Sequence, residues 1–397
     1  MPPGASAGLR TEDVVAVALP PGPEWIRIVA EVWDAGAALF PVDHRLPQPE
    51  VRALLDRAAP TVVHDAGAGW ARLPAGVPAD PKVALVVHTS GTGGALKLAQ
   101  FDRAAIDAAV ASSALALEAT PRDRWLCCLP LAHVGGLLVL LRAVLLGAPV
   151  TVHASFEPVA VGAERDAGFV SIVPAMLLRL LDANADLSHL RAILVGGSAL
   201  SAGLRARAEA ADARVIETYG LTESCGGVVY DGRPLAGIEA RIDPRDQGIQ
   251  LRGPTLMLGY RFDGEGTAAA FTEDGWLRTF DAGLLDPEGK LRVLGRLDDL
   301  IKTGGERVWP DEVEHALRTH AKVVDAAVAG RLDPEWGQRV VAYVVSADPA
   351  SPPTLEELRD HVSITLPRHK APRELVLVHE LPRTASGKVR RAGLGLV

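Results

Sequence analysis

The chain has 397 residues, of which 48% are hydrophobic and 23% charged, so it is globular in composition and too long for one ordinary core. Its formal net charge is −8, and the lack of a basic stripe argues against nucleic acid as the main partner. The three cysteines, Cys127, Cys128 and Cys225, form neither a disulfide framework nor a CxxC metal motif, and the N-terminal residues do not resemble a signal peptide. We therefore expect at least two domains and a reducing, cytoplasmic environment.

From Val14 to Tyr219, short β-rich runs alternate with helical patterns. Buried strands are predicted for VVAVALP, AALFPV, TVVHD, VALVVHTS, FVSIVP, RAILVGG and RVIETYG. Helices are predicted for EWIRIVAEVWDAG, PEVRALLDRAA, DRAAIDAAVASSALALE, AMLLRLLDA and SAGLRARAEAA, several of which follow Pro, Ser or Asp. This alternation predicts α/β layers with largely parallel sheets.

Residues 125–152 are almost wholly apolar and numerous enough to span a bilayer. Prolines, glycines, His133 and Arg142 interrupt this stretch, and a charged arginine inside a membrane is costly. We therefore predict a buried strand, a turn and a helix here, and no transmembrane segment.

The pattern changes after Gly226. Short strands separated by turn sequences such as DGRP, DPRDQG and DPEG predict a mainly antiparallel β subdomain up to about Leu294. A small α+β domain is predicted to follow, with helices at 311–319 and 355–365 and strands at 323–329, 339–345 and 375–378. We place a large domain at 1–295, a hinge at 296–299 and a small domain at 300–397.

A glycine-rich loop follows the strand VALVV in the segment HTSGTGGALKLAQ. Free backbone N–H groups, hydroxyls and the cation of Lys97 together suit phosphate oxygens. A Walker A loop is excluded, because Leu96 and Leu98 flank Lys97 where that motif has Gly and Ser or Thr. Taken alone, the segment also fits a flexible turn between a strand and the helix near Asp102. The candidate phosphate-binding residues are Thr89, Ser90, Gly91, Thr92, Gly93, Gly94 and Lys97.

The segment ETYGLTESCGG follows the strand RVI and holds a second set of candidates. Glu223, beside Thr222, offers a carboxylate of the kind that binds Mg²⁺ together with phosphate oxygens. Tyr219 offers a ring that can stack on a base. Taken alone, a surface loop with one solvated carboxylate explains this segment better.

Two later segments add further candidates. In RTFDAG and GRLDDLIKTGGE, Asp281 and Arg296 suit ribose hydroxyls, and Gly304 and Gly305 form a loop that a thin ligand can approach closely. In LPRTASGKVRR, Lys388 follows a Ser-Gly pair, although a solvated basic tail explains this segment when it is taken alone.

The order of these motifs resembles one family. Ser/Thr/Gly-Lys, YGxTE, GRxDDxIKxGG and PRTASGKxxR occur in the same order in the adenylate-forming superfamily of acyl-CoA ligases, adenylation domains and luciferases, and the resemblance covers essentially the whole chain. It implies a large domain of layered α/β sheets with a β subdomain, followed by a small mobile α+β domain. It also implies an ATP-dependent ligase that makes an acyl-adenylate and then a thioester, using a carboxylic acid, ATP, Mg²⁺ and coenzyme A.

The resemblance gives most motif residues an expected role. Residues 89–97 would cradle the triphosphate, Tyr219 would pack on the adenine, and Thr218 would also bind the nucleotide. Glu223 would ligate Mg²⁺, and Glu223 and Thr222 would be catalytic residues. Lys388 would bridge the attacking carboxylate and the α-phosphate. The remaining expected roles are ribose binding by Asp281 and Arg296, domain rotation about Asp298, and coenzyme A binding at Gly304 and Gly305.

The region around the predicted acid pocket is more specific. LPLAHVGGLLVLLRAVLLGA, LVGGSALS and YGLTESCGGVVYDGRPLAGI resemble the o-succinylbenzoate–CoA ligases of menaquinone synthesis. The expected acid contacts are His133, Arg142, Gly197 and Ser198. Arg142 is a lone cation in an apolar run, and such a cation is costly to bury unless an anion pairs with it. o-Succinylbenzoate has two carboxylates, and the succinyl one reacts. We therefore expect Arg142 to pair with the other carboxylate, which is on the aromatic ring. The alternatives are an arginine that snorkels to the surface and a histidine that is simply part of the core.

Three residues depart from the family pattern. Gly93, Leu96 and Phe280 stand where threonine, proline and glycine are usual, and the start of the chain resembles a point inside the usual large domain. The alternatives that stay open are another aryl- or acyl-CoA ligase, a stand-alone adenylation enzyme that loads a carrier protein, and a catalytically silent homologue. A homo-oligomer is compatible with the sequence.

Overall fold

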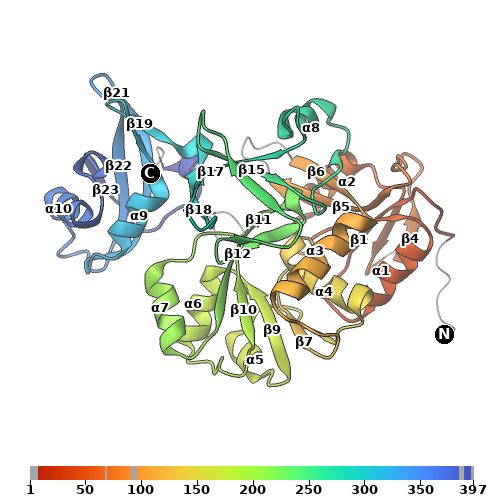
Figure 1. Cartoon of the computed structure of the whole chain (residues 1–397). Coiled ribbons are helices and arrows are strands. Elements are labelled where there is room, and N and C mark those ends of the chain that lie inside the picture. Colours follow the sequence, from red (N-terminus) through yellow and green to blue (C-terminus); the bar gives the residue numbers. More distant parts are fainter. Residues whose placement is uncertain (1–7, 68, 91–95, 384–388, 395–397) are drawn as a thin grey trace. The chain divides into compact units, whose positions relative to one another are not determined.

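The structure is a computed structural model that describes residues 8–67, 69–90, 96–383 and 389–394 (Figure 1). The chain forms two compact units. The first comprises Met1–Ala240 and Leu251–Leu277, and the second comprises Arg241–Gln250 and Arg278–Val397. The expected hinge at 296–299 lies within the second unit. The expected rotation of a small domain about this hinge therefore stays a prediction.

The first sheet of the first unit has the strand order β16-β6-β5-β2-β1-β3-β4. Its central pairs β1/β2, β1/β3 and β2/β5 are parallel, whereas β3/β4, β5/β6 and β6/β16 are antiparallel. The strands span Val14–Ala18 (β1), Ala38–Pro41 (β2), Val62–Asp65 (β3), Gly69–Arg72 (β4), Val83–Ser90 (β5), Leu96–Asp102 (β6) and Gly259–Tyr260 (β16).

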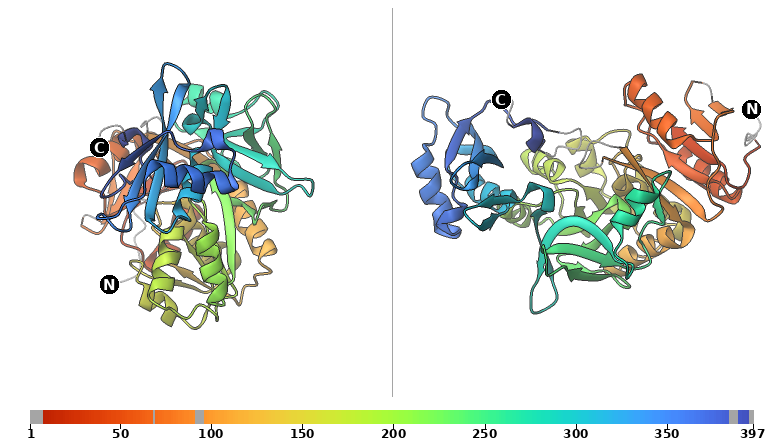
Figure 2. Two further views of the ribbon diagram at one scale, coloured as in Figure 1. Left: turned by 90° about the vertical axis from the view of Figure 1, so that its left-hand side faces the viewer. Right: turned by 90° about the horizontal axis from the view of Figure 1, so that it is seen from above.

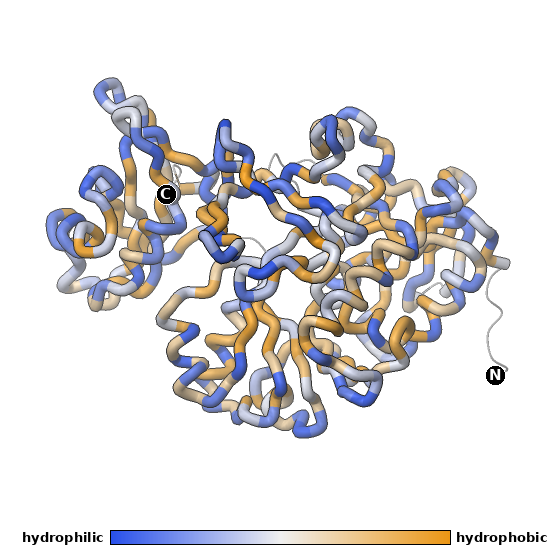
Figure 3. Tube along the Cα trace, in the orientation of Figure 1, coloured by the Kyte–Doolittle hydropathy of each residue, from blue (hydrophilic) through white to orange (hydrophobic). Residues whose placement is uncertain are grey.

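The second sheet of this unit has the order β13-β12-β11-β10-β9-β7-β8. The pairs from β8 to β11 are parallel, and β12 and β13 extend the sheet in antiparallel fashion. The strands span Arg124–Cys127 (β7), Val150–Val152 (β8), Ala167–Ile172 (β9), Ala192–Val195 (β10), Val215–Leu221 (β11), Gly226–Tyr230 (β12) and Arg233–Pro234 (β13). The strands at the centre of this sheet are hydrophobic along their length, as β9 and β10 show (Figure 3).

Helices cover both faces of each sheet in the first unit. In β1, Val15 and Val17 join the core that contains α1, α3 and α4, while Val14 and Ala16 join the core on the side of α2. On β9, Phe169 faces the same α1–α3–α4 layer, and Val170 faces α6. These helices span Glu24–Asp34 (α1), Gln48–Ala58 (α2), Arg103–Ala116 (α3), Val134–Leu146 (α4), Pro158–Ala163 (α5), Pro174–Asp182 (α6), Ala202–Ala210 (α7) and Gly264–Ala270 (α8).

The second unit contains two sheets. The strand order is β14-β15-β17-β18 in one and β20-β19-β22-β21 in the other, where β23 also pairs with β22. Helices α9 and α10 pack on one face of β21 and β22 (Figure 2). The elements span Glu239–Ile242 (β14), Gly248–Arg252 (β15), Leu277–Leu285 (β17), Leu291–Arg296 (β18), Leu297–Asp299 (η2), Ile301–Thr303 (β19), Glu306–Val308 (β20), Pro310–Arg318 (α9), Val323–Asp333 (β21), Gly337–Ser346 (β22), Leu355–Thr365 (α10), Glu374–Leu377 (β23) and Arg391–Gly393 (η4).

The predicted fold class is confirmed, with one local difference. Residues 125–152 form the predicted strand and helix, and within the described ranges we find no helix with the length and apolar character needed to cross a membrane. Helix α3 begins after Asp102, whose side chain accepts a hydrogen bond from the backbone N–H of Ala105 at 2.8 Å. The segment around Lys97, expected to be a turn, is instead strand β6, because it pairs along the whole of β5.

Candidate active site

The phosphate-loop candidates lie at the tip of the β5–β6 hairpin. Thr89 on β5 is directly opposite Lys97 on β6, and Ser90 is opposite Leu96. This register places Lys97 beside the end of β5. The candidates Gly91, Thr92, Gly93 and Gly94 lie outside the described residues.

Four further candidates follow parallel strands of the second sheet. Gly197 and Ser198 follow β10, and Thr222 and Glu223 form part of a short 3₁₀ helix (η1, Thr222–Ser224) after β11. Because β10 and β11 are parallel, these residues emerge at the same edge of the sheet, where ligands bind in open α/β sheets. Thr218 lies on β11, where its hydroxyl contacts the backbone carbonyl of Val195 at 3.4 Å, and Tyr219 lies beside it.

Gly220 has a structural reason to be glycine. A Cβ atom at this position would lie 1.9 Å from the backbone oxygen of Gly226 on the neighbouring strand β12. The pairing of β11 with β12 also shifts register between Tyr219 and Gly220. The glycine therefore permits the close approach that turns the chain into the Thr222–Glu223 segment.

Tyr260, which belongs to none of the sequence motifs, contacts two of the predicted site residues. Its hydroxyl donates a hydrogen bond to Oε1 of Glu223 at 2.8 Å, and Nζ of Lys97 lies 4.6 Å from the centre of its ring. Burial, and next the charge of Glu223, raise the pKa of Tyr260, so its hydroxyl keeps its proton at neutral pH. The backbone N–H of Met257 also donates to the carbonyl of Glu223 at 2.9 Å.

This arrangement fits a metal–nucleotide site. Strand β16 pairs with β6, which brings Tyr260 from a distant part of the sequence to Lys97. Tyr260 orients one carboxylate oxygen of Glu223, and the carboxylate is half-buried rather than enclosed. A carboxylate that is held in place beside a cation suits Mg²⁺ that arrives with phosphate oxygens.

Two histidines meet at the same part of the first unit. The rings of His88, on β5, and His133, the residue before α4, have centroids 5.6 Å apart. Burial, and next the proximity of His133, lower the pKa of His88 to about 4, so this ring is neutral at physiological pH. The predicted acid-binding residue His133 therefore has a second, neutral histidine as its neighbour.

Arg142 has different surroundings from those expected. Its side chain is buried, with an exposure of 3%, which excludes the surface-snorkelling alternative. The guanidinium group stacks on Trp125 at 3.9 Å and donates a hydrogen bond to Ser113 at 2.8 Å, while Ser113 also contacts the hydroxyl of Tyr230. Arg142 lies nine positions after His133 along α4, which corresponds to a rise of about 13 Å between the two residues.

The ribose candidates lie together in the second unit. Asp281 on β17 is opposite Arg296 on β18, and the two side chains form an ion pair at 2.9 Å. The preceding residue, Phe280, has a φ of 58°, in the left-handed region that favours glycine. Phe280 therefore adopts a backbone conformation that is less favourable for it than for the glycine that is usual at this position.

The remaining candidates also belong to the second unit. Gly304 and Gly305 form the turn between β19 and β20, with φ values of 59° and 84°, as a two-residue hairpin turn of this type requires. A Cβ atom at Gly304 would lie 2.7 Å from the ring of Trp336. The predicted hinge residue Asp298 is exposed in η2, and Lys388 lies outside the described residues.

The structure brings some predicted residues together and leaves others apart. Lys97 and Glu223 share Tyr260 as a neighbour, and Asp281 pairs with Arg296. The two functional neighbours missed from the sequence, Tyr260 and His88, carry only weak local signals. Tyr260 follows a glycine in LMLGY, and His88 directly precedes the predicted phosphate loop.

Comparisons with known proteins show the family to which the chain belongs. The family model described as AMP-binding enzyme matches residues 5–73 and 65–261, and the model of the AMP-binding enzyme C-terminal domain matches residues 312–388. A probable 2-succinylbenzoate–CoA ligase from Mycobacterium tuberculosis is 44% identical over 330 residues, which cover 79% of this chain and 84% of that protein.

Solved structures of the o-succinylbenzoate CoA synthetase from Bacillus subtilis are also similar. The complex with the acyl-adenylate intermediate has a TM-score of 0.86 and 29% identity, and the match covers 98% of this chain and 89% of that one. The complex with ATP and a magnesium ion has the same TM-score and identity, and the match covers 98% of this chain and 91% of that one. This chain belongs to the AMP-binding enzyme family.

Proposed function

We propose that this protein is an AMP-forming acid–CoA ligase that converts 2-succinylbenzoate, ATP and coenzyme A into 2-succinylbenzoyl-CoA, AMP and diphosphate. The observation that carries the proposal is the cluster of Lys97, Tyr260 and Glu223, in which one cation and one oriented carboxylate lie beside the phosphate-loop hairpin. The relatives described above include a probable 2-succinylbenzoate–CoA ligase and a synthetase with its acyl-adenylate bound, which supports this choice of acid.

The first half-reaction forms the acyl-adenylate. A carboxylate oxygen of the acid attacks the α-phosphorus of ATP, the bond from that phosphorus to the bridging oxygen breaks, and diphosphate leaves. In this proposal, Lys97 and the hairpin backbone bind the triphosphate, while Asp281 and Arg296 bind the ribose. Cations placed where negative charge develops are worth more in a partly dry site than in water.

Glu223 is the proposed ligand for Mg²⁺, with Thr222 beside it. Bound there, the ion would offset the charge repulsion between the two reacting anions. Tyr260 donates a hydrogen bond to the Glu223 carboxylate and so fixes its orientation. Such partners of metal ligands commonly determine metal affinity.

The second half-reaction transfers the acyl group to coenzyme A. The thiol sulfur attacks the acyl carbon, its proton is lost, and AMP leaves with the electron pair of the broken acyl–oxygen bond. We propose that Lys388 serves only the first half-reaction and that rotation about Asp298 exchanges it for the Gly304–Gly305 surface. Lys388→Ala should then abolish adenylation and spare thioester formation from preformed acyl-adenylate.

The proposed acid contacts are His133, Gly197 and Ser198, whose positions follow strands that end at one edge of the second sheet. His88 adds a neutral ring beside His133. Arg142 was expected to pair with the aromatic carboxylate, but its buried contacts with Trp125 and Ser113 favour a role within the core.

The test is a CoA-dependent thioester assay with ATP, Mg²⁺ and a panel of acids. The panel contains 2-succinylbenzoate, benzoate, 4-coumarate, acetate and a medium-chain fatty acid. Preference for 2-succinylbenzoate is the expected result. Preference for a monocarboxylate would support the ligase reaction but refute 2-succinylbenzoate as the acid. Adenylate formation without thioester formation would instead indicate transfer to a carrier protein.

We also propose that the enzyme acts in the cytoplasm. Cys127, Cys128 and Cys225 are buried, and burial raises the pKa of each thiol to about 12, so they are unreactive thiols suited to a reducing compartment.

A further inference from the structure

A hollow with a volume of about 470 Å³ lies in the first unit, between the last turns of α3, the start of β11 and the β12–β13 hairpin. This volume falls in the range of about 300–1,000 Å³ that is usual for small-molecule sites. Leu115 on α3 is 68% exposed there, although its side chain is large and apolar. The lining is mainly apolar and includes Leu115, Ala116, Val215, Ile216, Pro234 and Leu235.

The hollow is separate from the candidate active site. Val215, the first residue of β11, lines the hollow, whereas Thr222 and Glu223 follow the last residue of that strand. The strand Val215–Leu221 rises about 3.3 Å per residue, so its two ends lie about 20 Å apart. A small molecule in the hollow therefore does not contact Glu223.

Two arginines belong to the lining of the hollow. Arg214 immediately precedes β11, and Arg233 is directly opposite Tyr230 across the β12–β13 hairpin. Asp231 and Gly232 form the turn of this hairpin with φ values of 45° and 80°, as a two-residue turn of this type requires. The local sequence therefore fixes the position of Arg233, and both arginines are exposed.

The positive charge of these arginines is not balanced by the protein. Among the residues that the structure describes, the side chains of Arg214 and Arg233 form no ion pair or hydrogen bond. Asp231, the acidic residue of the lining, pairs instead with Arg205 at 3.3 Å. The hollow thus combines apolar walls with two cations that are free to bind an anion.

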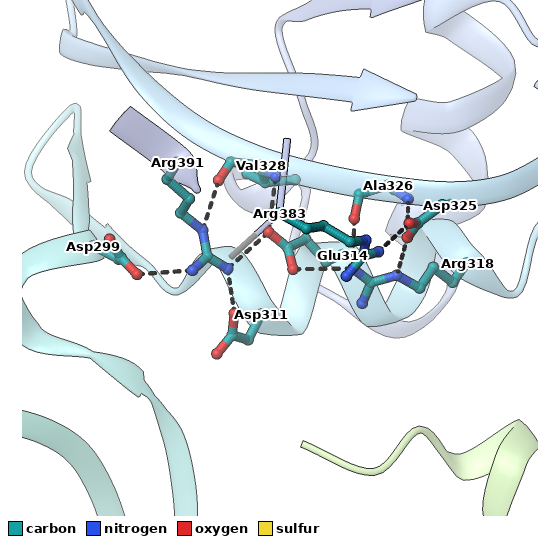
Figure 4. Close-up of polar contacts among 9 residues, drawn as sticks. All are labelled: Asp299, Asp311, Glu314, Arg318, Asp325, Ala326, Val328, Arg383 and Arg391. Carbon is teal, nitrogen blue, oxygen red and sulfur yellow. Dashed lines mark hydrogen bonds and ion pairs between the residues drawn. The ribbon is translucent and has the colours of Figure 1, made fainter. Parts of the chain in front are cut away.

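Arginines of the second unit show a different pattern (Figure 4). Arg391 pairs with Asp299 and with Glu314, each at 2.8 Å, and Arg318 pairs with Asp325 at 3.0 Å. These pairs join η2, α9 and β21 to one another and to the residues that follow. Arg214 and Arg233 join no elements in this way.

Protection of the sheet edge accounts for only part of the pattern at the hollow. Strand β13 lies at the edge of the second sheet, and a charge and a proline on such a strand hinder pairing with another chain. This reason covers Arg233 and Pro234. It does not cover Arg214, which precedes the internal strand β11, or the exposed side chain of Leu115.

We propose that the hollow binds an aromatic carboxylate, with its ring against Leu115 and Leu235 and its carboxylate at Arg214 and Arg233. A guanidinium group matches the planar carboxylate with paired hydrogen bonds. A rigid ring loses less conformational freedom in an open site than a flexible chain of the same size does, so a ring is favoured over a fatty acid. This inference does not depend on the proposed function.

The test is photolabelling of the full-length protein with 4-benzoylbenzoate, an aromatic carboxylate whose ketone bonds to nearby C–H groups under ultraviolet light. Tandem mass spectrometry should locate the label within residues 112–116 and 234–236, which line the hollow. An excess of 2-naphthoate should suppress the label at these residues. A label near Glu223 or His133 reports binding at the candidate active site and is counted separately.

Variants test the two parts of the proposed site. In Arg214→Gln/Arg233→Gln, the Kd obtained from the concentration dependence of this label should rise about fivefold. The matched control Arg52→Gln/Arg57→Gln removes two exposed charges from α2 and should stay within about twofold of the wild type. Ala236→Trp should abolish the label by filling the hollow. If Ala236→Trp does not fold, Ala116→Trp takes its place.

Several outcomes would overturn the inference. They are a label found only outside residues 112–116 and 234–236, a label that persists in Ala236→Trp, and an equal weakening in both arginine double variants. A concentration-dependent dimer that Ala236→Trp abolishes would assign the hollow to a second copy of the chain instead. Because the label needs no catalysis, failure of the thioester assay would overturn the proposed function and leave this inference standing.

Discussion

Tyr260 provides the sharpest test of the proposed nucleotide site. Tyr260→Phe removes the hydroxyl that donates to Glu223 at 2.8 Å and keeps the ring that lies 4.6 Å from Nζ of Lys97. Tyr260 itself is 8% exposed, so the substituted ring stays packed. The substitution therefore isolates one hydrogen bond to a charged acceptor.

The expected size of the effect follows from that bond. Hydrogen bonds to charged groups contribute about 1.5–3 kcal/mol, and the half-buried carboxylate of Glu223 allows water to replace part of the loss, so we expect about 1.5 kcal/mol. This corresponds to about a tenfold change in an equilibrium constant. The loss of a group that orients a metal ligand commonly costs 10- to 100-fold in metal affinity, which agrees with this value.

The assay is diphosphate release at saturating acid and ATP with Mg²⁺ as the variable. In Tyr260→Phe, the Mg²⁺ concentration for half-maximal rate should rise about tenfold. Tyr343→Phe is the matched control, since it removes a buried hydroxyl that accepts from Arg331 at 3.2 Å in the second unit. An unchanged Mg²⁺ dependence in Tyr260→Phe, or an equal change in Tyr343→Phe, would refute the reasoning.

Three further predictions concern packing, pH and acid recognition. Gly220→Ala places a Cβ atom 1.9 Å from the Gly226 oxygen, so the free energy of unfolding should fall by about 3 kcal/mol or more and adenylation should be lost. Gly203→Ala, where nothing lies within 4 Å of the added atom on α7, should stabilise the protein in the same denaturant titration. Folding lowers the pKa of His88 from 6.5 to about 4, so between these pH values His88 is protonated in the unfolded chain but not in the folded one. The free energy of unfolding should therefore fall as the pH drops from 6.5 towards 4. The fall should be at most roughly 3 kcal/mol and should be absent in His88→Gln, when free energies of unfolding are compared at pH 7 and pH 4.5. Arg142→Met should leave the KM for the acid and for ATP within about threefold of the wild type, because Ser113 and Trp125 already hold the guanidinium group. A tenfold rise in the KM for the acid alone would restore Arg142 as the partner of the aromatic carboxylate.

The sequence by itself determined the elements and the order of the motifs. The apolar runs of β1, β9 and β10 are buried on both faces, and such runs are visible without tertiary information. Helix α10 spans the predicted residues 355–365. Its start is set by a capping box of Thr354 and Glu357, two residues that are close together in the sequence.

Only the tertiary structure decided which side chains meet. Tyr260 reaches Glu223, 37 residues away, through the pairing of β16 with β6, and Arg391 reaches Asp299 across 92 residues. Arg142 shows the reverse case, since its local pattern suggested an exposed or substrate-facing cation, whereas folding surrounds it with Trp125 and Ser113. Hydrophobic periodicity is a property of neighbouring residues, but hydrogen bonds and ion pairs depend on distances of about 3 Å between atoms that strand register and helix packing alone bring together.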